Sequence, residues 1–371
     1  MSRVLQEQWK TISAGSIERR AELELLYAAV IASDDRIVVL EGGPGTGKTT
    51  LAAQFVRAYR EAFPGGIEYS TGTGEPDRQL TPASANERAL LVFDGLDEVW
   101  IGVEKTLGYL ESRKAENPFL HVLLTSRALP QLAPFERIAL GPMTNAEIET
   151  LIAREAGNAG LPPASIVAVT GGNPLLARMI AQIMQKRGDW PSLIESLRSF
   201  RRPGLIDIHG QPLSGQSQPA RTFISDVRDV NEAIMQMARL DPDIVYQLPP
   251  RRFEEISAEL FTRLGYEVTL TPASNEGGKD LIIVKRTDLG TMLTFVECKR
   301  HLPGTPVGVE IVRTLNGVVE EGRATSGIVL TSSRFTRGAR IEQRKLEYRM
   351  SLKDYSDFKE LLDRAMQPLI R

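Results

Sequence analysis

The chain contains 371 residues, of which 42% are hydrophobic and 25% are charged, and its formal net charge is −2. This composition is that of an ordinary globular protein of about two or three domains. It excludes a chain that binds nucleic acid through an overall basic charge, so any basic surface must be local.

The cysteine count and the absence of apolar segments indicate the cellular compartment in which we expect the protein. A single cysteine excludes an intrachain disulfide and suits a reducing environment. The first residues, MSRVLQEQWKTISAG, lack the apolar centre of a signal peptide, and no apolar run approaches the roughly 18 residues of a membrane span. We therefore expect a cytoplasmic protein with no membrane partner, and we treat residues 1–17 as an amino-terminal segment.

Short apolar runs alternate with amphipathic stretches from about residue 20 to residue 200. The runs RIVVL (36–40), ALLVF (89–93) and HVLLT (121–125) predict buried strands, and KTTLAAQFVRAYREAF (48–63) predicts a helix. Such alternation is typical of a parallel α/β sheet.

The pattern becomes purely helical after the third of these strands. The stretch TNAEIETLIAREAG (144–157) predicts a helix that begins with a capping box between Thr144 and Glu147. A second helix is predicted over residues 173–188. We expect these helices to form a small helical subdomain beside the sheet.

A phosphate-binding loop is indicated by GGPGTGKTT, which fits G-x-x-x-x-G-K-[ST] between a predicted strand and a predicted helix. The glycines let backbone N–H groups face phosphate oxygens, the lysine reaches the β- and γ-phosphates, and the following hydroxyl binds Mg²⁺. A chance match in a glycine-rich turn is the alternative, and the flanking elements disfavour it. The residues expected to bind ATP or ADP here are Gly42, Gly45, Gly47, Lys48, Thr49 and Thr50.

The metal side of this site requires a carboxylate at the end of a neighbouring strand. ALLVFDGLDE supplies Asp94, which we expect to hold Mg²⁺ together with Thr49. Asp97 and Glu98 follow on the loop, where either one of them polarises a water molecule or both merely solvate the loop or cap a helix.

Four motifs occur in one order: FPGGIEYSTG, LLVFDGLDE, HVLLTSR and TGGNPLLARMIA. In this order they resemble the STAND NTPases of the NB-ARC and NACHT groups, over about residues 18–195. The resemblance implies an ATP/ADP switch that hydrolyses slowly and forms homo-oligomers. It places Arg127 near the γ-phosphate and Pro174 against the nucleotide. An arginine at a strand end also suits phosphate by its own geometry, although a surface role is the alternative.

Two features depart from that family. Gly95 stands where fast ATPases carry a base, which favours a switch over a motor. The winged-helix domain that usually follows has no room before the linker, so the sequence leaves open what locks the nucleotide state.

Residues 201–221, RRPGLIDIHGQPLSGQSQPAR, have the composition of a linker, and a helix is predicted at about 224–240. We group these as a linker and helix over residues 201–244. The remainder, residues 245–371, predicts a helix and a strand, then strand, strand, helix, strand and helix.

A second site is indicated by NEGGKDLIIV and FVECKR. Asp280 begins one apolar strand, while Glu297 and Lys299 lie on one face of the next strand. Two carboxylates suit Mg²⁺, which would orient a phosphate, and a lysine could position water or stabilise the transition state. The alternative is a surface ion pair. Cys298 alternates to the opposite face and is expected to be buried.

Context favours the catalytic reading. PPRRFEEISAELFTRLGYEV, GGKDLIIV, FVECKR and GIVLTSSRFTRGAR resemble, in order and spacing, the Mrr-type restriction endonucleases of the PD-(D/E)xK nuclease superfamily. This resemblance also implies that Glu254, on the first helix, faces the metal. An ordinary solvated helix face is the alternative for Glu254.

The predicted fold class is therefore α/β. A P-loop NTPase sheet with a helical subdomain occupies residues 18–200, and after the linker a restriction-endonuclease-like α/β/α domain occupies residues 245–371. The window 334–349 holds six basic residues against two acidic ones, a local charge of +4, and predicts a surface for double-stranded DNA. A solvated helix of mixed charge is the alternative.

Together the two resemblances imply a nucleotide-regulated, Mg²⁺-dependent DNA endonuclease of prokaryotic antiviral or restriction defence. A partner protein could supply the sensor. The alternatives are an oligomeric, nucleotide-gated DNA-binding scaffold with an inactive nuclease domain, and an ATP-dependent restriction motor.

Overall fold

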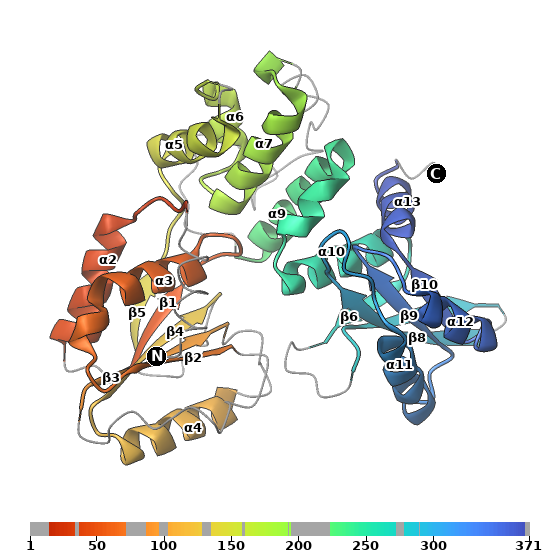
Figure 1. The fold of residues 1–371 in the computed structure, drawn as a ribbon, viewed down its shortest axis with the longest axis horizontal. Helices are drawn as coiled ribbons and strands as arrows, with labels where there is room; N and C mark the ends of the chain where they lie inside the picture. Colours follow the sequence, from red (N-terminus) through yellow and green to blue (C-terminus); the bar gives the residue numbers. More distant parts are fainter. Residues whose placement is uncertain are drawn as a thin grey trace.

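A computed structural model describes residues 15–33, 37–71, 87–95, 103–127, 135–157, 160–191, 193, 223–271, 278–288 and 290–367. In these residues two five-stranded sheets lie at opposite sides of the molecule, with helices between them (Figure 1). Both predicted α/β units are thus present, which confirms the predicted fold class. No helix of the described ranges is long and apolar enough to cross a membrane.

The first sheet is parallel throughout and has the strand order β2-β3-β4-β1-β5. Its strands are β1 (Ile37–Glu41), β2 (Ile67–Thr71), β3 (Ala89–Asp94), β4 (Leu120–Ser126) and β5 (Glu136–Ala139). The three predicted strands correspond to β1, β3 and β4. Because parallel strands end at the same edge, this order brings the residues that follow β1, β3 and β4 together.

Helices cover both faces of this sheet (Figure 1). They are α2 (Arg20–Tyr27), which continues into η1 (Ala28–Ala32), α3 (Lys48–Tyr59), which continues into η2 (Arg60–Ala62), and α4 (Val103–Glu116). Alternate residues of each strand face opposite cores. Val38 packs with Phe55 of α3, whereas Val39 packs with Leu110 of α4. A strand buried on both faces explains the continuous apolar runs in the sequence.

The helical subdomain contains α5 (Asn145–Ala156), α6 (Ala164–Val169) and α7 (Pro174–Arg187). The predicted capping box is present, because the Glu147 N–H donates to Thr144 Oγ1 (3.3 Å) and the Thr144 N–H donates to Glu147 Oε2 (2.7 Å). The helix expected at about 224–240 is α9 (Phe223–Leu240), and the predicted linker over residues 201–221 lies outside the described residues.

The second sheet is mixed and has the order β10-β9-β8-β7-β6. Pairs among β6, β7 and β8 are antiparallel, and pairs among β8, β9 and β10 are parallel. The strands are β6 (Glu267–Leu270), β7 (Leu281–Thr287), β8 (Gly290–Lys299), β9 (Ser326–Thr331) and β10 (Met350–Lys353).

Helices also cover both faces of the second sheet (Figure 1). They are α10 (Pro250–Arg263), α11 (Val309–Glu321), α12 (Arg337–Lys345) and α13 (Tyr355–Ala365). On β8, Val296 packs with Phe253 of α10 and Phe358 of α13, while Phe295 packs with Val312 of α11 on the opposite face. This is the predicted α/β/α arrangement.

The helical subdomain and the second domain share one apolar core. Ile180 of α7, Ile234 of α9 and Phe253 of α10 belong to the same buried cluster. Polar contacts strengthen the junction at η6 (Pro242–Gln247), where Lys186 lies 2.7 Å from Asp241 and 2.8 Å from Asp243. Because this core is continuous, α10 is packed against the helical subdomain through α9.

Candidate nucleotide and nuclease sites

The loop between β1 and α3 has the curl expected of a phosphate cradle. Gly45 and Gly47 have φ values of +76° and +96°, which L side chains rarely adopt. The Lys48 amine lies over the loop and donates to the carbonyl oxygens of Gly42 (2.7 Å) and Gly43 (3.1 Å). The loop therefore places a cation and the start of a helix at one point, where phosphate groups are stabilised.

Asp94 lies beside this loop, at the end of β3. The Thr49 hydroxyl donates to Asp94 at 2.9 and 3.0 Å from its two oxygens. The hydroxyls of Tyr69 (3.1 Å) and Thr125 also donate to Asp94, and the Gly95 N–H donates to Thr125 (2.9 Å). The two groups predicted to share Mg²⁺ are thus in contact. Neither Tyr69 nor Thr125 was predicted, because Thr125 ends an apolar predicted strand and no pattern around Tyr69 indicates a polar role.

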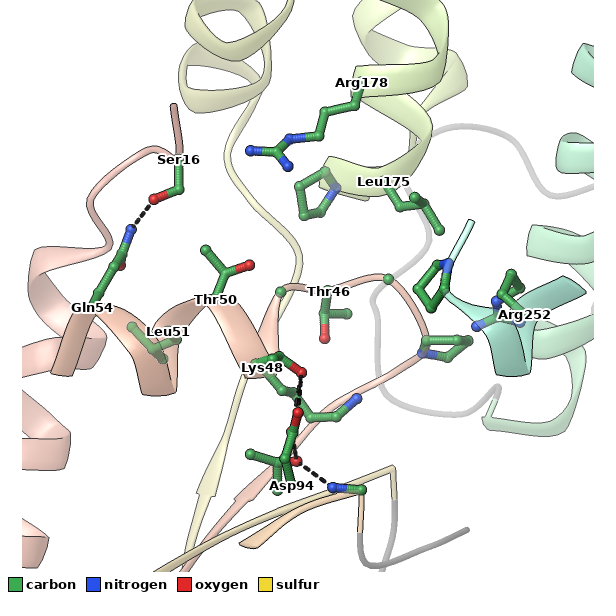
Figure 2. A pocket seen from close by; sticks show the side chains of 18 of the residues that line it. Ser16, Thr46, Lys48, Thr50, Leu51, Gln54, Asp94, Leu175, Arg178 and Arg252 are labelled. Atoms are coloured by element: carbon green, nitrogen blue, oxygen red, sulfur yellow. Dashed lines mark hydrogen bonds between the residues drawn. The ribbon is translucent and has the colours of Figure 1, made fainter. Parts of the chain in front are cut away.

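These groups surround a cavity of about 720 Å³, shown in Figure 2. Arg127 and Pro174, both predicted here, line it, as do Gly45, Gly47 and Thr50. Gly42 takes part through its contact with Lys48. Asp97 and Glu98 lie outside the described residues. The ammonium, guanidinium and hydroxyl groups around one cavity fit a nucleotide with its phosphates, and Thr49 with Asp94 would hold its Mg²⁺.

Two polar residues at the start of α7, which the sequence motifs did not single out, lie at or beside the cavity. Asn173 caps α7 by accepting from the N–H groups of Leu175 (3.0 Å) and Leu176 (3.3 Å), and it donates to the Pro44 carbonyl (2.9 Å). It therefore joins the helical subdomain to the phosphate loop. Arg178 lies one helical turn after Pro174 and points toward the cavity (Figure 2). An asparagine directly before Pro174 is a helix-start signal that could have identified Asn173.

Gly45→Ala is expected to weaken nucleotide binding by about tenfold, because a positive φ costs an L residue about 1–2 kcal/mol. The added Cβ would also lie 2.8 Å from Asn173 Oδ1 and displace the loop. Gly43→Ala is the matched control, because its Cβ would meet Thr46 at an ordinary 3.6 Å. Calorimetric titration with ADP measures both affinities, and equal affinities for the two variants would contradict the expectation.

The second sheet brings the predicted nuclease residues to one edge. Asp280 directly precedes β7, and its N–H donates to the Val296 carbonyl of β8 (2.7 Å). Its carboxylate accepts from the N–H of Cys298 (2.6 Å), which lies between Glu297 and Lys299. The pairing of β7 with β8 thus explains why two motifs 17 residues apart form one site.

Glu297 and Lys299 point to the same face, as predicted, and their charged groups lie 2.5 Å apart. Their side chains are 13% and 31% exposed, so this is no fully solvated surface pair. Burial lowers the pKa of Lys299, but the hydrogen bond and charge of Glu297 outweigh it, and the net pKa is raised. Lys299 therefore stays protonated, as a stabiliser of phosphate charge must be.

Glu254 reaches the same region from α10. Its Oε2 lies 2.8 Å from Nη1 of Arg251. Burial raises the pKa of Glu254, and the hydrogen bond and charge of Arg251 oppose that rise. Burial, followed by the charges of Glu297 and Glu254, raises the pKa of Asp280 to about 7. The predicted acids are therefore close enough to influence one another.

A divalent cation fits this arrangement of acids. Glu297 Oε2 is buried without a hydrogen-bond partner, and Asp280 lies across from it. No cluster of three His, Cys, Asp or Glu side chains in the described ranges is arranged to hold an ion alone. Mg²⁺ is commonly held by one or two carboxylates with substrate phosphates and water, so Asp280 and Glu297 suffice for that mode.

Asp280→Asn is expected to raise the melting temperature of the metal-free protein at pH 8. The folded-state pKa of about 7 exceeds the usual 3.8, so the linked stability is complete below pH 3.8 and lost as pH rises through 7. Because asparagine cannot ionise, Asp280→Asn avoids that loss. We expect the free energy of unfolding at pH 8 to rise by on the order of 1 kcal/mol or more. Calorimetry in EDTA measures it, and a gain that is as large at pH 4 as at pH 8 would refute the electrostatic origin.

The comparison with protein families identifies the second domain. Residues 245–362 match the family Mrr_cat, described as "Restriction endonuclease". The chain therefore carries an Mrr_cat restriction endonuclease domain at its carboxyl-terminal end. Asp280, Glu297 and Lys299 all lie inside this Mrr_cat domain.

Further comparisons give more distant similarities. The uncharacterized protein y4cE of Sinorhizobium fredii is 33% identical over 113 residues, which are 30% of this chain and 29% of y4cE. The chain thus spans less than a third of that relative's length. The MspJI restriction endonuclease in complex with an oligonucleotide is 21% identical (TM-score 0.28), over 46% of this chain and 40% of its own. Cdc6p from Pyrobaculum aerophilum is 15% identical (TM-score 0.36), over 71% and 94%. Similarity at this level identifies no function.

Cys298 of the Mrr_cat domain is buried among apolar residues, as expected, and burial raises the pKa of its thiol. The predicted basic window is less charged than its composition suggests. Within it, Arg340 pairs with Asp354, Lys345 with Glu342, and Arg349 with Glu320. The remaining basic residues of the window are exposed: Arg334, Arg337 and Arg344.

Proposed function

We propose that this chain is a nucleotide-regulated, Mg²⁺-dependent DNA endonuclease of prokaryotic restriction or antiviral defence, with ATP or ADP bound by a STAND-like first domain. The observation that carries the proposal is the meeting of Asp280, Glu297 and Lys299 at one edge of a sheet inside a restriction endonuclease domain. A phosphate loop in the same chain supports the nucleotide part.

Each residue of the nuclease site has a role that its chemistry suits. Asp280 and Glu297 would hold Mg²⁺, which orients the scissile phosphate and lowers the pKa of a water molecule. Lys299, kept protonated by Glu297, would stabilise the charge that develops on the phosphate oxygens. Glu254 would orient water or a ligand of the metal from the α10 side. In the hydrolysis, the water oxygen would bond to phosphorus, the P–O bond to the leaving sugar oxygen would break, and the proton that the water loses would pass through solvent to that leaving oxygen.

The exposed arginines suit the DNA backbone. Arg334 follows β9, and Lys299 ends β8, which pairs with β9 in parallel register. Arg334 and Arg337 therefore extend from the strand edge that carries the active site. Their phosphate contacts would give affinity that is independent of sequence and falls with salt. Cleavage of both strands needs two active sites, so we expect a homo-oligomer, with a partner protein as a candidate sensor.

Cleavage of supercoiled plasmid by the purified chain tests the nuclease proposal. We expect nicked and linear DNA with Mg²⁺, no product in EDTA, and restored cleavage when excess Mg²⁺ is added back. Methylated and unmethylated plasmids, each with no nucleotide, ADP or ATP, cover the substrate and nucleotide conditions. An intact plasmid under every condition would instead favour the DNA-binding scaffold with an inactive nuclease domain.

A further inference from the structure

The cavity that holds the phosphate loop is also lined by the Mrr_cat domain. Pro250, Arg251 and Arg252, the first residues of α10, line it together with Lys48 and Arg127. Figure 2 shows Arg252 on a helix at the side of the cavity opposite Gln54. Two arginines of the nuclease domain therefore border the proposed nucleotide site.

A buried ion-pair chain fixes α10 in this position. Arg127, which directly follows β4, lies 2.6 Å from Glu255, and Arg252 lies 2.5 Å from the other oxygen of Glu255. The side chains of Arg252 and Glu255 are both 5% exposed, and Arg252 also donates to Asn231 (3.0 Å). Removing one partner of such a buried pair is strongly destabilising, because it leaves the other charge buried without compensation. Arg252 is thus held in place as a structural residue.

The ion pair between Arg127 and Glu255 also indicates the end of the cavity at which α10 lies. Thr125 of β4 contacts Asp94, the carboxylate of the proposed Mg²⁺ site, and Arg127 follows two residues later. Ser16 and Gln54 lie at the opposite wall (Figure 2). Arg251 therefore belongs to the end of the cavity where the phosphates would lie.

Arg251 differs from Arg252 in its partner. Its guanidinium pairs with Glu254 at 2.8 Å, and Glu254 belongs to the nuclease site. An arginine can exchange a carboxylate for a phosphate, because its planar group pairs with both in the same geometry. Arg251 thus lies between two sites that can both accept its charge.

We propose that Arg251 is a nucleotide-binding residue supplied by the Mrr_cat domain, and that nucleotide phosphate and Glu254 compete for its guanidinium. This inference rests on the proposed nucleotide site and adds a residue from the other domain to it. When a nucleotide is bound, its phosphate pairs with Arg251, and Glu254 loses this partner. The charge of Glu254 then acts more strongly on Lys299 and the metal ligands. Reciprocally, any group that engages Glu254 favours the nucleotide-bound arrangement.

The electrostatics of Glu254 agree with this competition. Arg251 opposes the pKa rise that burial imposes on Glu254, and Glu254 in turn raises the pKa of Asp280. Loss of the Arg251 contact therefore changes the charge around the metal ligands. The α10 helix provides a direct physical connection between nucleotide and nuclease.

Calorimetric titration of the full chain with ADP and with a non-hydrolysable ATP analogue tests the proposal. Arg251→Gln is expected to weaken binding by about tenfold, the equivalent of one charged hydrogen bond, and Arg251→Lys to weaken it less. Arg263→Gln is the matched control, because Arg263 lies on the same helix, pairs with Glu259 at 3.0 Å, and is remote from the cavity. We expect that control to bind like the wild type.

The nucleotide affinity of Glu254→Gln distinguishes a binding role of Arg251 from a merely structural role of Arg251. This substitution removes the competitor, so we expect nucleotide affinity to rise by about threefold or more, and the gain to vanish in the Arg251→Gln/Glu254→Gln double variant. Unchanged affinity in Arg251→Gln, with binding lost in Lys48→Ala, would overturn this inference alone. Equal losses in Arg251→Gln and Arg263→Gln would also overturn it. A wild-type chain that binds neither nucleotide would overturn the proposed nucleotide site itself.

Discussion

Lys299→Ala is expected to lower the rate of plasmid cleavage by about 10²- to 10³-fold, the loss typical of one transition-state charge stabiliser. Lys299 is the cation that lies 2.5 Å from Glu297 at the site edge, and its raised pKa keeps it charged. The substitution also removes the partner of a half-buried carboxylate. Single-turnover cleavage at saturating Mg²⁺ measures the effect without contributions from product release.

Lys353→Ala is the control for Lys299. Lys353 lies on β10 of the same sheet, two strands away from β8, and pairs with Asp357 at 3.5 Å. We expect its cleavage rate to equal that of the wild type, with both variants folded by circular dichroism. A folded Lys299→Ala that cuts within about threefold of the wild type would remove Lys299 from the catalytic assignment.

Lys48→Ala is expected to weaken binding of ATP and ADP by about 10²-fold, or roughly 2.7 kcal/mol, which lies within the range of hydrogen bonds to charged groups. The Lys48 amine now donates to two loop carbonyls, Gly42 and Gly43, and would turn to the phosphates. Calorimetric titration measures the affinity.

The control for Lys48 is Arg57→Ala, which removes an exposed cation from the last turn of the same helix. It should bind nucleotide normally. If Lys48→Ala and Arg57→Ala bound ADP equally well, the loop would not be a nucleotide site.

Features with a local signal could be predicted from the sequence. The phosphate loop needs glycines at fixed spacing, and the predicted strand at 36–40 appears as β1 (Ile37–Glu41). The capping box at Thr144 depends on residues three positions apart. The pair Glu297 and Lys299 follows from the period of a strand. Each of these signals lies within one element or its ends.

Features that depend on distant parts of the chain could not be predicted in this way. Arg127 and Glu255 are 128 residues apart, and nothing in either motif indicates their contact. The composition of window 334–349 gives a local charge of +4, but Arg340 and Arg349 pair with Asp354 and Glu320 outside it. The position of α10 at the nucleotide cavity likewise results from a core shared across domains, which packing alone determines.

The central claim is that one chain couples a nucleotide site to a DNA nuclease. The most direct test is the plasmid cleavage rate with no nucleotide, ADP or ATP, for the wild type, Lys48→Ala and Lys299→Ala. We predict wild-type rates that differ by about tenfold or more between nucleotide states, equal rates in Lys48→Ala, and no cleavage by Lys299→Ala. Wild-type cleavage at one rate in all three states, matched by Lys48→Ala, would contradict the coupling.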